Sequence, residues 1–472
     1  MSNTSNPKSR SNSQPADEDW VGELIWAVVK GAARVLWLAI LFPFLGVPVV
    51  VSIWVGVAYG VRAGVWTAWV ATVGYGMWAF LSPPAFDTWV LAPVRQGWLS
   101  WWRYQRNWDA VCTLHGLSTK LGQRVLIPAL QSVNISTYGD ILTVRVVTGQ
   151  SVNDWQKQAP ALAAAWRADR LVIRVRTPGE LQVIIMRGDV LARPLRLPMP
   201  TPTASVDLAA VRVGVTESQR WWRLPVLGHH ILVAGATGAG KGSVLWSLIA
   251  GLAPEVKSGR VRLCVIDPKG GMELGAGAPM FSEFCVDVGE TTVQMLRRLV
   301  ALMQTRAARL RGHTRLHTPT DDEPLIVVVI DEIAALTAYV TDRKARGEIE
   351  QLLGLLLSQG RAVGISVVAA VQDPAKDTLP VRQLFTVRIG LRMTEGTQTA
   401  MVLGQGARDA GAECELVGDS TPGIGYTMVD GTAQPMRVRA FYVSNADIVH
   451  LARTFPCPRP TDGSQSSDRG ER

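Results

Sequence analysis

The feature that most constrains this chain is an apolar run that leads into a glycine-rich turn and then into a second apolar run. Residues 229–234 read HHILVA, and residues 235–243 read GATGAGKGS. The first run suits a buried strand, and residues 244–252 suit a helix. The glycines let several backbone N–H groups converge on one anion, close to the positive end of the helix dipole. The segment therefore predicts a binding site for the phosphates of a nucleotide.

All nine residues of the turn are candidate nucleotide-binding residues, and the Lys241 ammonium is expected to reach the outer phosphates. They are Gly235, Ala236, Thr237, Gly238, Ala239, Gly240, Lys241, Gly242 and Ser243. The position after the lysine, where a hydroxyl commonly ligates magnesium, is Gly242. The nearest hydroxyl belongs to Ser243, and the sequence leaves open whether Ser243 or a water molecule reaches the metal.

A second apolar run ends in two carboxylates. Residues 325–330 read LIVVVI, which suits a strand buried on both faces of a parallel sheet, and Asp331 and Glu332 follow. Open α/β sheets bind their ligands at this end of the strands. We expect Asp331 to hold Mg²⁺, directly or through water, and Glu332 to activate a water molecule for attack on a phosphate. ATP and Mg²⁺ are therefore the predicted ligands.

Strands and helices alternate through residues 201–445. The segments 262–266 and 365–371 suit strands, whereas 291–310 and 349–357 suit helices. This alternation predicts an α/β domain with a doubly wound parallel sheet. Before it, three strand-like segments bracket a helical stretch at 152–168 and predict a small α+β adapter domain at 108–200, with a proline-rich linker at 194–202. The strand-like segments are 141–147, 170–175 and 181–186.

Two long uncharged stretches near the N-terminus predict a membrane anchor at residues 21–107. Each is long enough to cross a bilayer, so two transmembrane helices are expected near 35–56 and 63–82. Twelve of the 17 tryptophans lie between Trp20 and Trp108, and indole rings favour the membrane boundary. Basic residues flank both ends of the pair, so we expect a multi-pass protein of the cell membrane with the nucleotide-binding domain in the cytoplasm. The alternative is a buried hairpin of a soluble domain.

Polar composition predicts a disordered tail at residues 1–20 and a polar tail at 446–472. The five cysteines are scattered and imply neither a zinc site nor a disulfide framework. The formal net charge of +9 suits a polyanionic partner, although part of it lies beside the predicted spans and suits acidic lipid equally. Residues 269–271 and the basic segment 306–315 are candidate DNA-contacting loops, or simply solvated surface.

In this order, the motifs resemble those of the FtsK/SpoIIIE family of hexameric double-stranded DNA translocases. The resemblance covers most of residues 205–445, and it is carried by the segments 231–243, 266–269, 330–332, 360–365, 370–374, 388–389 and 435–444. It implies a RecA-like P-loop domain, a homo-hexamer with composite active sites, and ATP hydrolysis coupled to translocation of double-stranded DNA.

The resemblance also implies roles for individual residues. Arg361 is similar in position to the family's arginine finger, which acts on a neighbouring subunit's nucleotide, and Gln372 is similar to its γ-phosphate sensor. Arg388 is a second candidate for the finger. Glu332, Arg361 and Gln372 are thus the predicted catalytic residues, with Asp331 and Ser243 on the metal.

Two departures from the family pattern bear on function. Asp373 stands where the family commonly has arginine, and the sequence after Ser444 leaves no room for the winged-helix module of the cell-division members. Residues 238–247 resemble the actinobacterial plasmid-transfer branch of TraB/TraSA type. The expected function is therefore a membrane-anchored, ATP-dependent double-stranded DNA translocase for conjugative plasmid transfer.

Several alternatives stay open at this point. They are a chromosome-partitioning FtsK-like translocase, a type IV coupling protein that pumps single-stranded DNA, a type VII-like secretion ATPase, and a membrane scaffold that binds nucleotide without turnover.

Overall fold

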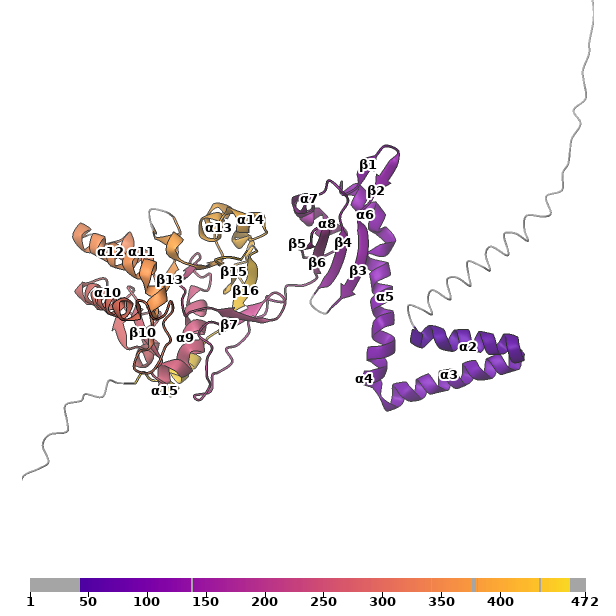
Figure 1. Ribbon diagram of the computed structural model, residues 1–472, viewed down its shortest axis with the longest axis horizontal. Helices are drawn as coiled ribbons and strands as arrows, with labels where there is room; N and C mark the ends of the chain where they lie inside the picture. Colours follow the sequence, from indigo (N-terminus) through magenta and orange to yellow (C-terminus); the bar gives the residue numbers. More distant parts are fainter. Residues whose placement is uncertain are drawn as a thin grey trace, which may run out of the picture. The chain divides into compact units, whose positions relative to one another are not determined.

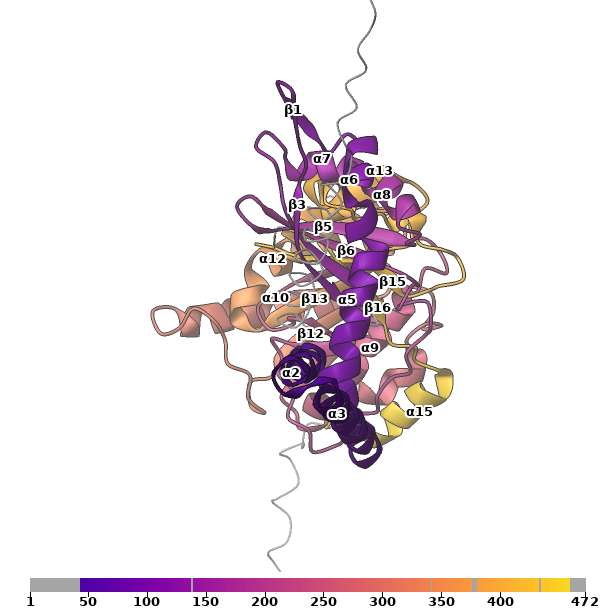
Figure 2. The ribbon, with the colours of Figure 1, turned by 90° about the vertical axis from the view of Figure 1, so that its right-hand side faces the viewer.

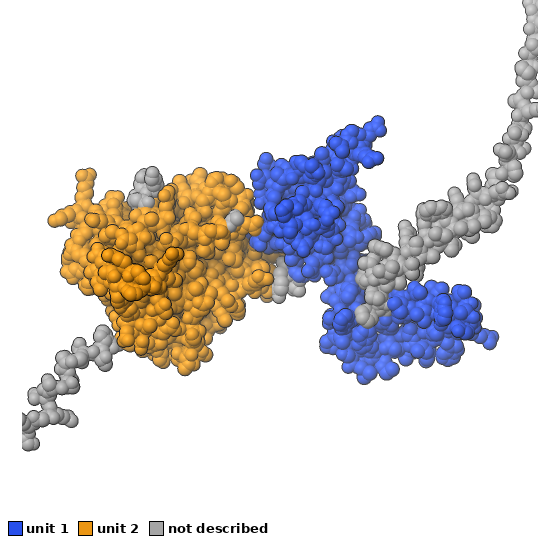
Figure 3. Space-filling view, viewed as in Figure 1, with its two compact units in different colours: residues 1–186 blue, residues 187–472 orange. Residues whose placement is uncertain are grey.

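The computed structural model describes residues 43–136, 139–340, 342–375, 379, 381–432 and 434–458. Contacts divide the chain into two compact units, residues 1–186 and 187–472 (Figure 3). The predicted tail at 1–20 and the last fourteen residues of the predicted tail at 446–472 lie outside the described residues.

The second unit, which contains β7, β10 and β13 in Figure 1, is built on one ten-stranded sheet. The strand order is β11-β10-β12-β13-β9-β14-β15-β16-β7-β8. The six strands from β11 to β14 are parallel, whereas every later pairing, from β14 and β15 to β7 and β8, is antiparallel. The predicted all-parallel sheet is therefore wrong for the last four strands. Short hairpin connections join β7 to β8 and β15 to β16, and such connections permit only antiparallel pairing. The strands are β7 Val211–Thr216, β8 Trp221–Leu224, β9 Ile231–Ala234, β10 Val261–Ile266, β11 Glu283–Cys285, β12 Leu325–Ile330, β13 Ile365–Val371, β14 Val387–Leu391, β15 Ile424–Val429 and β16 Met436–Ala440.

Helices cover both faces of this sheet. Leu232 and Ala234 of β9 join one core, beneath α10, α12 and α13, whereas Ile231 and Val233 join the other, beneath α9 and α15. Because both faces are covered, the central strands are apolar at every position, as predicted for residues 325–330. The helices are α9 Lys241–Lys257, η3 Gly275–Met280, α10 Glu290–Leu310, α11 Ile333–Thr337, α12 Arg343–Gln359, η4 Gly360–Val363, η5 Arg382–Leu384, α13 Gly396–Leu403, α14 Gln405–Asp409, η6 Cys414–Leu416 and α15 Asn445–Thr454.

Two segments that the sequence analysis placed outside the α/β domain belong to the second unit: residues 187–200, predicted as the end of the adapter domain, and the predicted tail from residue 446. Asp189 accepts two hydrogen bonds from Arg437, at 2.8 and 2.7 Å. Helix α15 begins at a capping box formed by Ser444 and Asp447, and it buries Leu451 against the sheet. The structure thus differs from the predicted boundaries at 200 and 446, because ion pairs and an amphipathic helix hold these polar sequences in place.

The first unit contains a four-stranded antiparallel sheet with the order β3-β4-β6-β5. The predicted helix at 152–168 is present as α7 and α8, and α7 begins at a capping box of Ser151 and Asp154. The sequence did not reveal β3 or the small hairpin of β1 and β2. The elements are β1 Thr119–Leu121, β2 Arg124–Leu126, β3 Ala129–Ile135, β4 Asp140–Arg145, α7 Val152–Lys157, α8 Ala159–Ala165, β5 Arg170–Thr177 and β6 Glu180–Met186.

The core of this sheet begins before the predicted adapter boundary at 108. Tyr104 is fully buried and donates a hydrogen bond of 2.6 Å to Asp140. Trp108 stacks on Trp166 at 5.9 Å and donates to the carbonyl oxygen of Pro128. One of the tryptophans counted toward a membrane boundary is therefore a core residue of the first unit.

Helices occupy both predicted membrane spans, with a break at Gly60. They are α2 Pro43–Tyr59 and α3 Val61–Leu81, and Figure 2 shows them side by side. A Cβ atom on Gly64 would lie 2.8 Å from the Cα of Gly56, so the close packing of the pair requires glycine there. They are followed by α4 Pro83–Phe86, η1 Asp87–Leu91, α5 Ala92–Arg103, η2 Gln105–Asn107 and α6 Trp108–Leu114.

The expectation of transmembrane helices at 35–56 and 63–82 is not confirmed. Among the described residues, no helix combines the length and apolarity that crossing a membrane requires. Helix α2 has 17 residues, and α3 begins with Arg62 in its first turn and contains three glycines. Residues 35–42 of the first predicted span lie outside the described part of the chain.

Candidate functional site

The predicted nucleotide-binding residues gather at one edge of the ten-stranded sheet, where its parallel strands end. The glycine-rich turn follows β9, Asp267 follows β10, Asp331 follows β12 and Gln372 follows β13. These four strands are neighbours in parallel register, so their C-terminal ends bring together residues that are far apart in sequence. Open α/β sheets bind ligands at such an edge.

The phosphate loop, residues 235–240, is tightly constrained. Gly240 has a φ of 97°, and a Cβ there would lie 2.2 Å from the backbone nitrogen of Gly423. Lys241 opens α9, and its ammonium donates hydrogen bonds to the carbonyl oxygens of Gly235 at 2.8 Å and Ala236 at 3.3 Å. Burial lowers the pKa of Lys241, although the charge of Glu332 opposes this shift. The loop thus folds around a buried ammonium group, at the N-terminus of a helix of 17 residues.

The two predicted carboxylates have different surroundings. Asp331 is buried and forms an ion pair with Lys269, with 2.6 Å between Oδ2 and Nζ. Burial would lower the pKa of Lys269, but the hydrogen bond and the charge of Asp331 together raise it. Glu332 accepts a hydrogen bond from the Ala334 amide through Oε1, and its other carboxylate oxygen is buried with no partner among the described residues.

The environment of Glu332 suits proton transfer. Only 6 % of this residue is exposed, and burial raises its pKa, with the Ala334 amide and the Lys241 ammonium acting in the opposite direction. A carboxylate with a raised pKa is a better proton acceptor, and its free oxygen is the atom that can take the proton. Buried polar atoms without partners are uncommon in proteins and call for an explanation.

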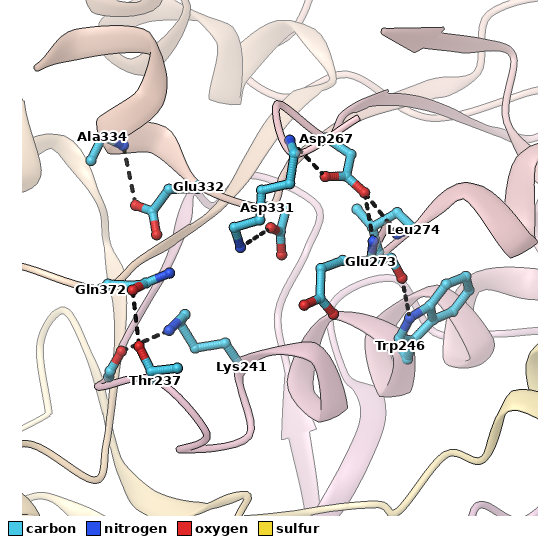
Figure 4. Close-up of polar contacts among 12 residues, drawn as sticks. Thr237, Lys241, Trp246, Asp267, Glu273, Leu274, Asp331, Glu332, Ala334 and Gln372 are labelled. Carbon is cyan, nitrogen blue, oxygen red and sulfur yellow. Dashed lines mark hydrogen bonds and ion pairs between the residues drawn. The ribbon is translucent and has the colours of Figure 1, made fainter. Parts of the chain in front are cut away.

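Gln372 lies beside the phosphate loop, as the resemblance implies. The hydroxyl of Thr237 donates to its Oε1 at 3.1 Å (Figure 4). The Thr237 carbonyl oxygen in turn accepts a hydrogen bond of 2.7 Å from Arg392, which also forms an ion pair with Asp419. The sequence analysis did not single out Arg392, because it follows β14 and has no motif around it.

A turn after β10 supplies two more charged groups that the sequence analysis did not assign to the site. Asp267 accepts hydrogen bonds from the amides of Glu273 and Leu274, both at 2.9 Å, and so holds the turn that carries Lys269 and Glu273. The Trp246 indole donates to the Glu273 carbonyl at 3.2 Å. In Figure 4 the carboxylates of Asp331 and Glu273 point into the same space beside Lys241. The signal in the sequence was that Asp267, Lys269 and Glu273 follow directly after a predicted strand.

The residues present fit a magnesium ion whose ligands come partly from the protein and partly from the phosphates of a bound nucleotide. Mg²⁺ is usually bound in proteins by one or two carboxylates together with phosphates and water. The described residues contain no group of three metal-ligating side chains that could hold an ion alone. Ser243 is half-buried in the first turn of α9, and its hydroxyl makes no hydrogen bond to the described residues. A cation nearby is supported by two observations: Asp331 is a buried carboxylate, and one oxygen of Glu332 is buried without a hydrogen-bond partner among the described residues.

The structure does not bring Arg361 together with these residues. Arg361 lies in η4, before β13, whereas Gln372 follows the same strand. The seven residues of β13 separate the two by about 20 Å, at about 3.3 Å per residue. Arg361 is exposed and makes no described hydrogen bond or ion pair. Within one chain it therefore lies at the opposite edge of the sheet.

Arg388, the second candidate finger, lies within β14 and not at the nucleotide edge. It pairs in register with Leu232 and forms an ion pair with Asp430 at 3.3 Å. The two candidate DNA-contacting segments also have internal partners, since Lys269 pairs with Asp331 and Arg306 is buried. The five cysteines are free, as expected.

Comparison with known proteins gives one matching family model. Residues 204–415 match the model of the FtsK/SpoIIIE family. The chain is similar to "Transfer protein TraSA" of Streptomyces ambofaciens, with 28% identity over 347 residues that cover 69% of this chain and 81% of that protein. It is also similar to "DNA translocase FtsK" of Halalkalibacterium halodurans, with 25% identity over 360 residues that cover 71% of this chain.

The chain spans only 42% of the length of that FtsK protein. Among solved structures, the chain is similar to the conjugation coupling protein TcpA of pCW3 in its monomer form with ATPγS. The TM-score is 0.48 at 22% identity, over 74% of this chain and 99% of that one.

Proposed function

We propose that this chain is an ATPase that drives double-stranded DNA and that its cargo is a conjugative plasmid, on the support of the match between residues 204–415 and the FtsK/SpoIIIE family model. The observation that carries the proposal is the convergence of Lys241, Asp331 and Glu332 at one edge of the sheet. The similarity to a transfer protein over most of its length supports the plasmid cargo.

The residues of the site divide the chemistry among them. The phosphate loop and Lys241 hold the phosphates of ATP through backbone N–H groups and one positive charge. Asp331 would hold magnesium, directly or through water, and Ser243 is the hydroxyl that the sequence offers beside it; the ion would neutralise charge on the transferring phosphoryl group. Glu332 takes a proton from the attacking water through its free oxygen. Gln372, tied to the loop through Thr237, responds to the state of the phosphates.

The position of Arg361 supports assembly into a ring. An arginine at the opposite edge of the sheet reaches a nucleotide only on another copy of the chain, which makes the active site composite. We propose a homo-hexamer in which Arg361 completes the site of the neighbouring subunit. Contacts to duplex phosphates would carry little sequence information and would weaken as salt rises.

We further propose that residues 21–107 attach the protein to the cell membrane and leave the ATPase in the cytoplasm. The support is the run of exposed apolar side chains along α2 and α3 and the basic residues that flank the pair. Large exposed apolar surfaces on a folded chain indicate a membrane or a partner.

Nucleic-acid-stimulated ATP hydrolysis tests the function directly. The full chain, purified in detergent, should release phosphate faster when long linear duplex DNA is added, and Glu332→Gln should lose about 10²-fold or more of that rate while still binding ATP. Analytical ultracentrifugation with ATP and DNA should give a hexamer.

Other outcomes of this assay select the alternatives. Stimulation by single strands alone would favour a coupling protein, and stimulation by a secreted protein substrate alone would favour a secretion ATPase. A baseline that Glu332→Gln leaves unchanged would mean a scaffold without turnover and would overturn the proposal.

A further inference from the structure

The sequence departs from the phosphate-loop pattern at Gly242, which leaves the first turn of α9 without the hydroxyl that normally reaches magnesium. Gly242 lies in ordinary helical backbone, so its conformation does not require glycine. A Cβ at this position would meet a single neighbour within 4 Å, the Oε2 atom of Glu273, at 3.7 Å. The space that a serine hydroxyl would enter therefore adjoins a carboxylate oxygen.

Glu273 is held at this point by its backbone and not by its side chain. Its amide donates a hydrogen bond of 2.9 Å to Asp267. Its carbonyl oxygen accepts one of 3.2 Å from the indole of Trp246, which lies one helical turn after Gly242. The carboxylate itself makes no described hydrogen bond or ion pair. Because both backbone groups of Glu273 are hydrogen-bonded, its carboxylate starts from a fixed position in the turn.

The same space contains the other charged groups of the site. The charge of Glu273 acts on both Lys241 and Lys269, and Lys269 is bonded to Asp331. The buried Glu332, whose charge also acts on Lys241, keeps one carboxylate oxygen without a partner among the described residues, which is an independent sign that a ligand belongs beside this ammonium group. The charges of Glu332, Lys269, Asp331 and Glu273 thus all act on the one ammonium group of Lys241.

We propose that the carboxylate of Glu273 replaces the hydroxyl missing at Gly242 as a ligand on the magnesium side of the nucleotide site. This inference rests on the proposed function only in that the site binds a magnesium nucleotide. It answers the question that the sequence left open, because a carboxylate from the turn after β10, and not Ser243, takes the place of the usual side chain.

Equilibrium binding of a fluorescent ATP analogue to the full chain tests the proposal, with and without Mg²⁺. Glu273→Gln should lose about 10-fold or more of the affinity gained on adding Mg²⁺, the size of loss typical of groups around a metal site. Its affinity in EDTA should stay unchanged. Glu283→Gln is the matched control: this carboxylate on β11 pairs with Arg298 of α10, and its loss should leave both affinities unchanged.

A rescue experiment makes the test specific. Adding Gly242→Ser to Glu273→Gln restores a hydroxyl at the position where the Cβ has room, so it should recover most of the Mg²⁺-dependent affinity. Full Mg²⁺-dependent affinity in Glu273→Gln, or no recovery in the folded double variant, would overturn the inference. If the Mg²⁺ effect follows this pattern while DNA fails to stimulate hydrolysis, the inference stands and the proposed function fails.

Discussion

The two edges of the ten-stranded sheet use charged residues in opposite ways. At the C-terminal edge, Glu332 keeps a buried oxygen without a partner. At the N-terminal edge, Arg306 is buried too, but its guanidinium donates to the carbonyl oxygens of Val363, Gly364 and Pro324, at 3.1, 3.3 and 2.9 Å. Buried groups with complete partners stabilise a fold, whereas incomplete ones indicate a ligand.

The N-terminal edge nevertheless presents an unpartnered charge on its surface, that of Arg361. Arg361 lies in the turn η4, which is held by Arg306 from α10 and by the amide of His317, a donor to Ala362 at 2.8 Å. Gly364 closes the turn with a φ of 75°, directly against the His317 ring. Arg306 and His317 thus fix the conformation of the turn, and the turn exposes Arg361 to solvent.

The largest effect is expected from Arg361→Ala. DNA-stimulated hydrolysis should fall by about 10³-fold or more, the usual contribution of an arginine finger. The melting temperature should not change, because the side chain is exposed and unpaired. Arg453→Ala, at an exposed arginine of α15, should keep full activity.

Mixing tests whether Arg361 acts in trans. Combining Arg361→Ala with Lys241→Ala chains should restore part of the activity, because some interfaces then join two intact halves. A mixture as inactive as its components would contradict the composite site.

Arg306→Leu should mainly reduce stability. Three buried carbonyl oxygens lose their donor at about 1 kcal/mol each, so the free energy of unfolding of the second unit should fall by about 3 kcal/mol in urea denaturation. Arg309→Leu, one turn away on the same helix, removes only an exposed ion pair with Glu323 and should cost less than about 1 kcal/mol. Equal losses from the two variants would remove the contrast between buried and exposed arginines at this edge.

Acid should destabilise the N-terminal edge through its histidines. Burial lowers the pKa of His230 to about 3 and that of His317 to about 4. Below pH 6.5 these two histidines bind protons in the unfolded chain but not in the folded chain. The free energy of unfolding is therefore highest above pH 6.5 and falls as the pH drops. At pH 5 His230 alone should account for roughly 2 kcal/mol.

Urea denaturation at pH 7.5 and pH 5 measures this loss. His230→Asn, which keeps an acceptor for the Val367 amide, should reduce the difference between the two pH values. His450→Gln, on the exposed side of α15, should leave it unchanged. A pH profile that is identical in wild type and His230→Asn would contradict the assignment.

The smallest effect is expected from Thr237→Val. It removes one exposed hydrogen bond to Gln372, worth about 1 kcal/mol, so hydrolysis should slow by about 5- to 10-fold without a change in melting temperature. Thr432→Val, in the turn between β15 and β16, is the control. Wild-type hydrolysis by Thr237→Val would mean that Gln372 does not depend on the loop for its position.

Much of the C-terminal edge could be predicted because its residues follow strands that are apolar at every position. The phosphate loop, Asp331 and Glu332 all stand directly after such runs, and parallel strands deliver their ends to the same edge. The antiparallel strands β7, β8, β15 and β16 could not be recognised, because arginine, threonine or glycine interrupts their apolar runs and their pairing depends on contacts across the sheet. Residues 187–200, predicted as the end of the adapter domain and the start of the linker at 194–202, and helix α15 were not recognised as parts of this unit, because the partners that hold them are distant in sequence.

The sequence by itself determined that a phosphate-binding loop and two carboxylates belong to one α/β domain, because local runs of apolar residues encode buried strands and their ends. Only the tertiary structure decided that Lys269 and Glu273 join this site, that Arg306 is structural, and that Arg361 lies at the far edge. Those assignments depend on which turns lie beside one another, and such distances are set by packing across the sheet and not by the order of residues along the chain.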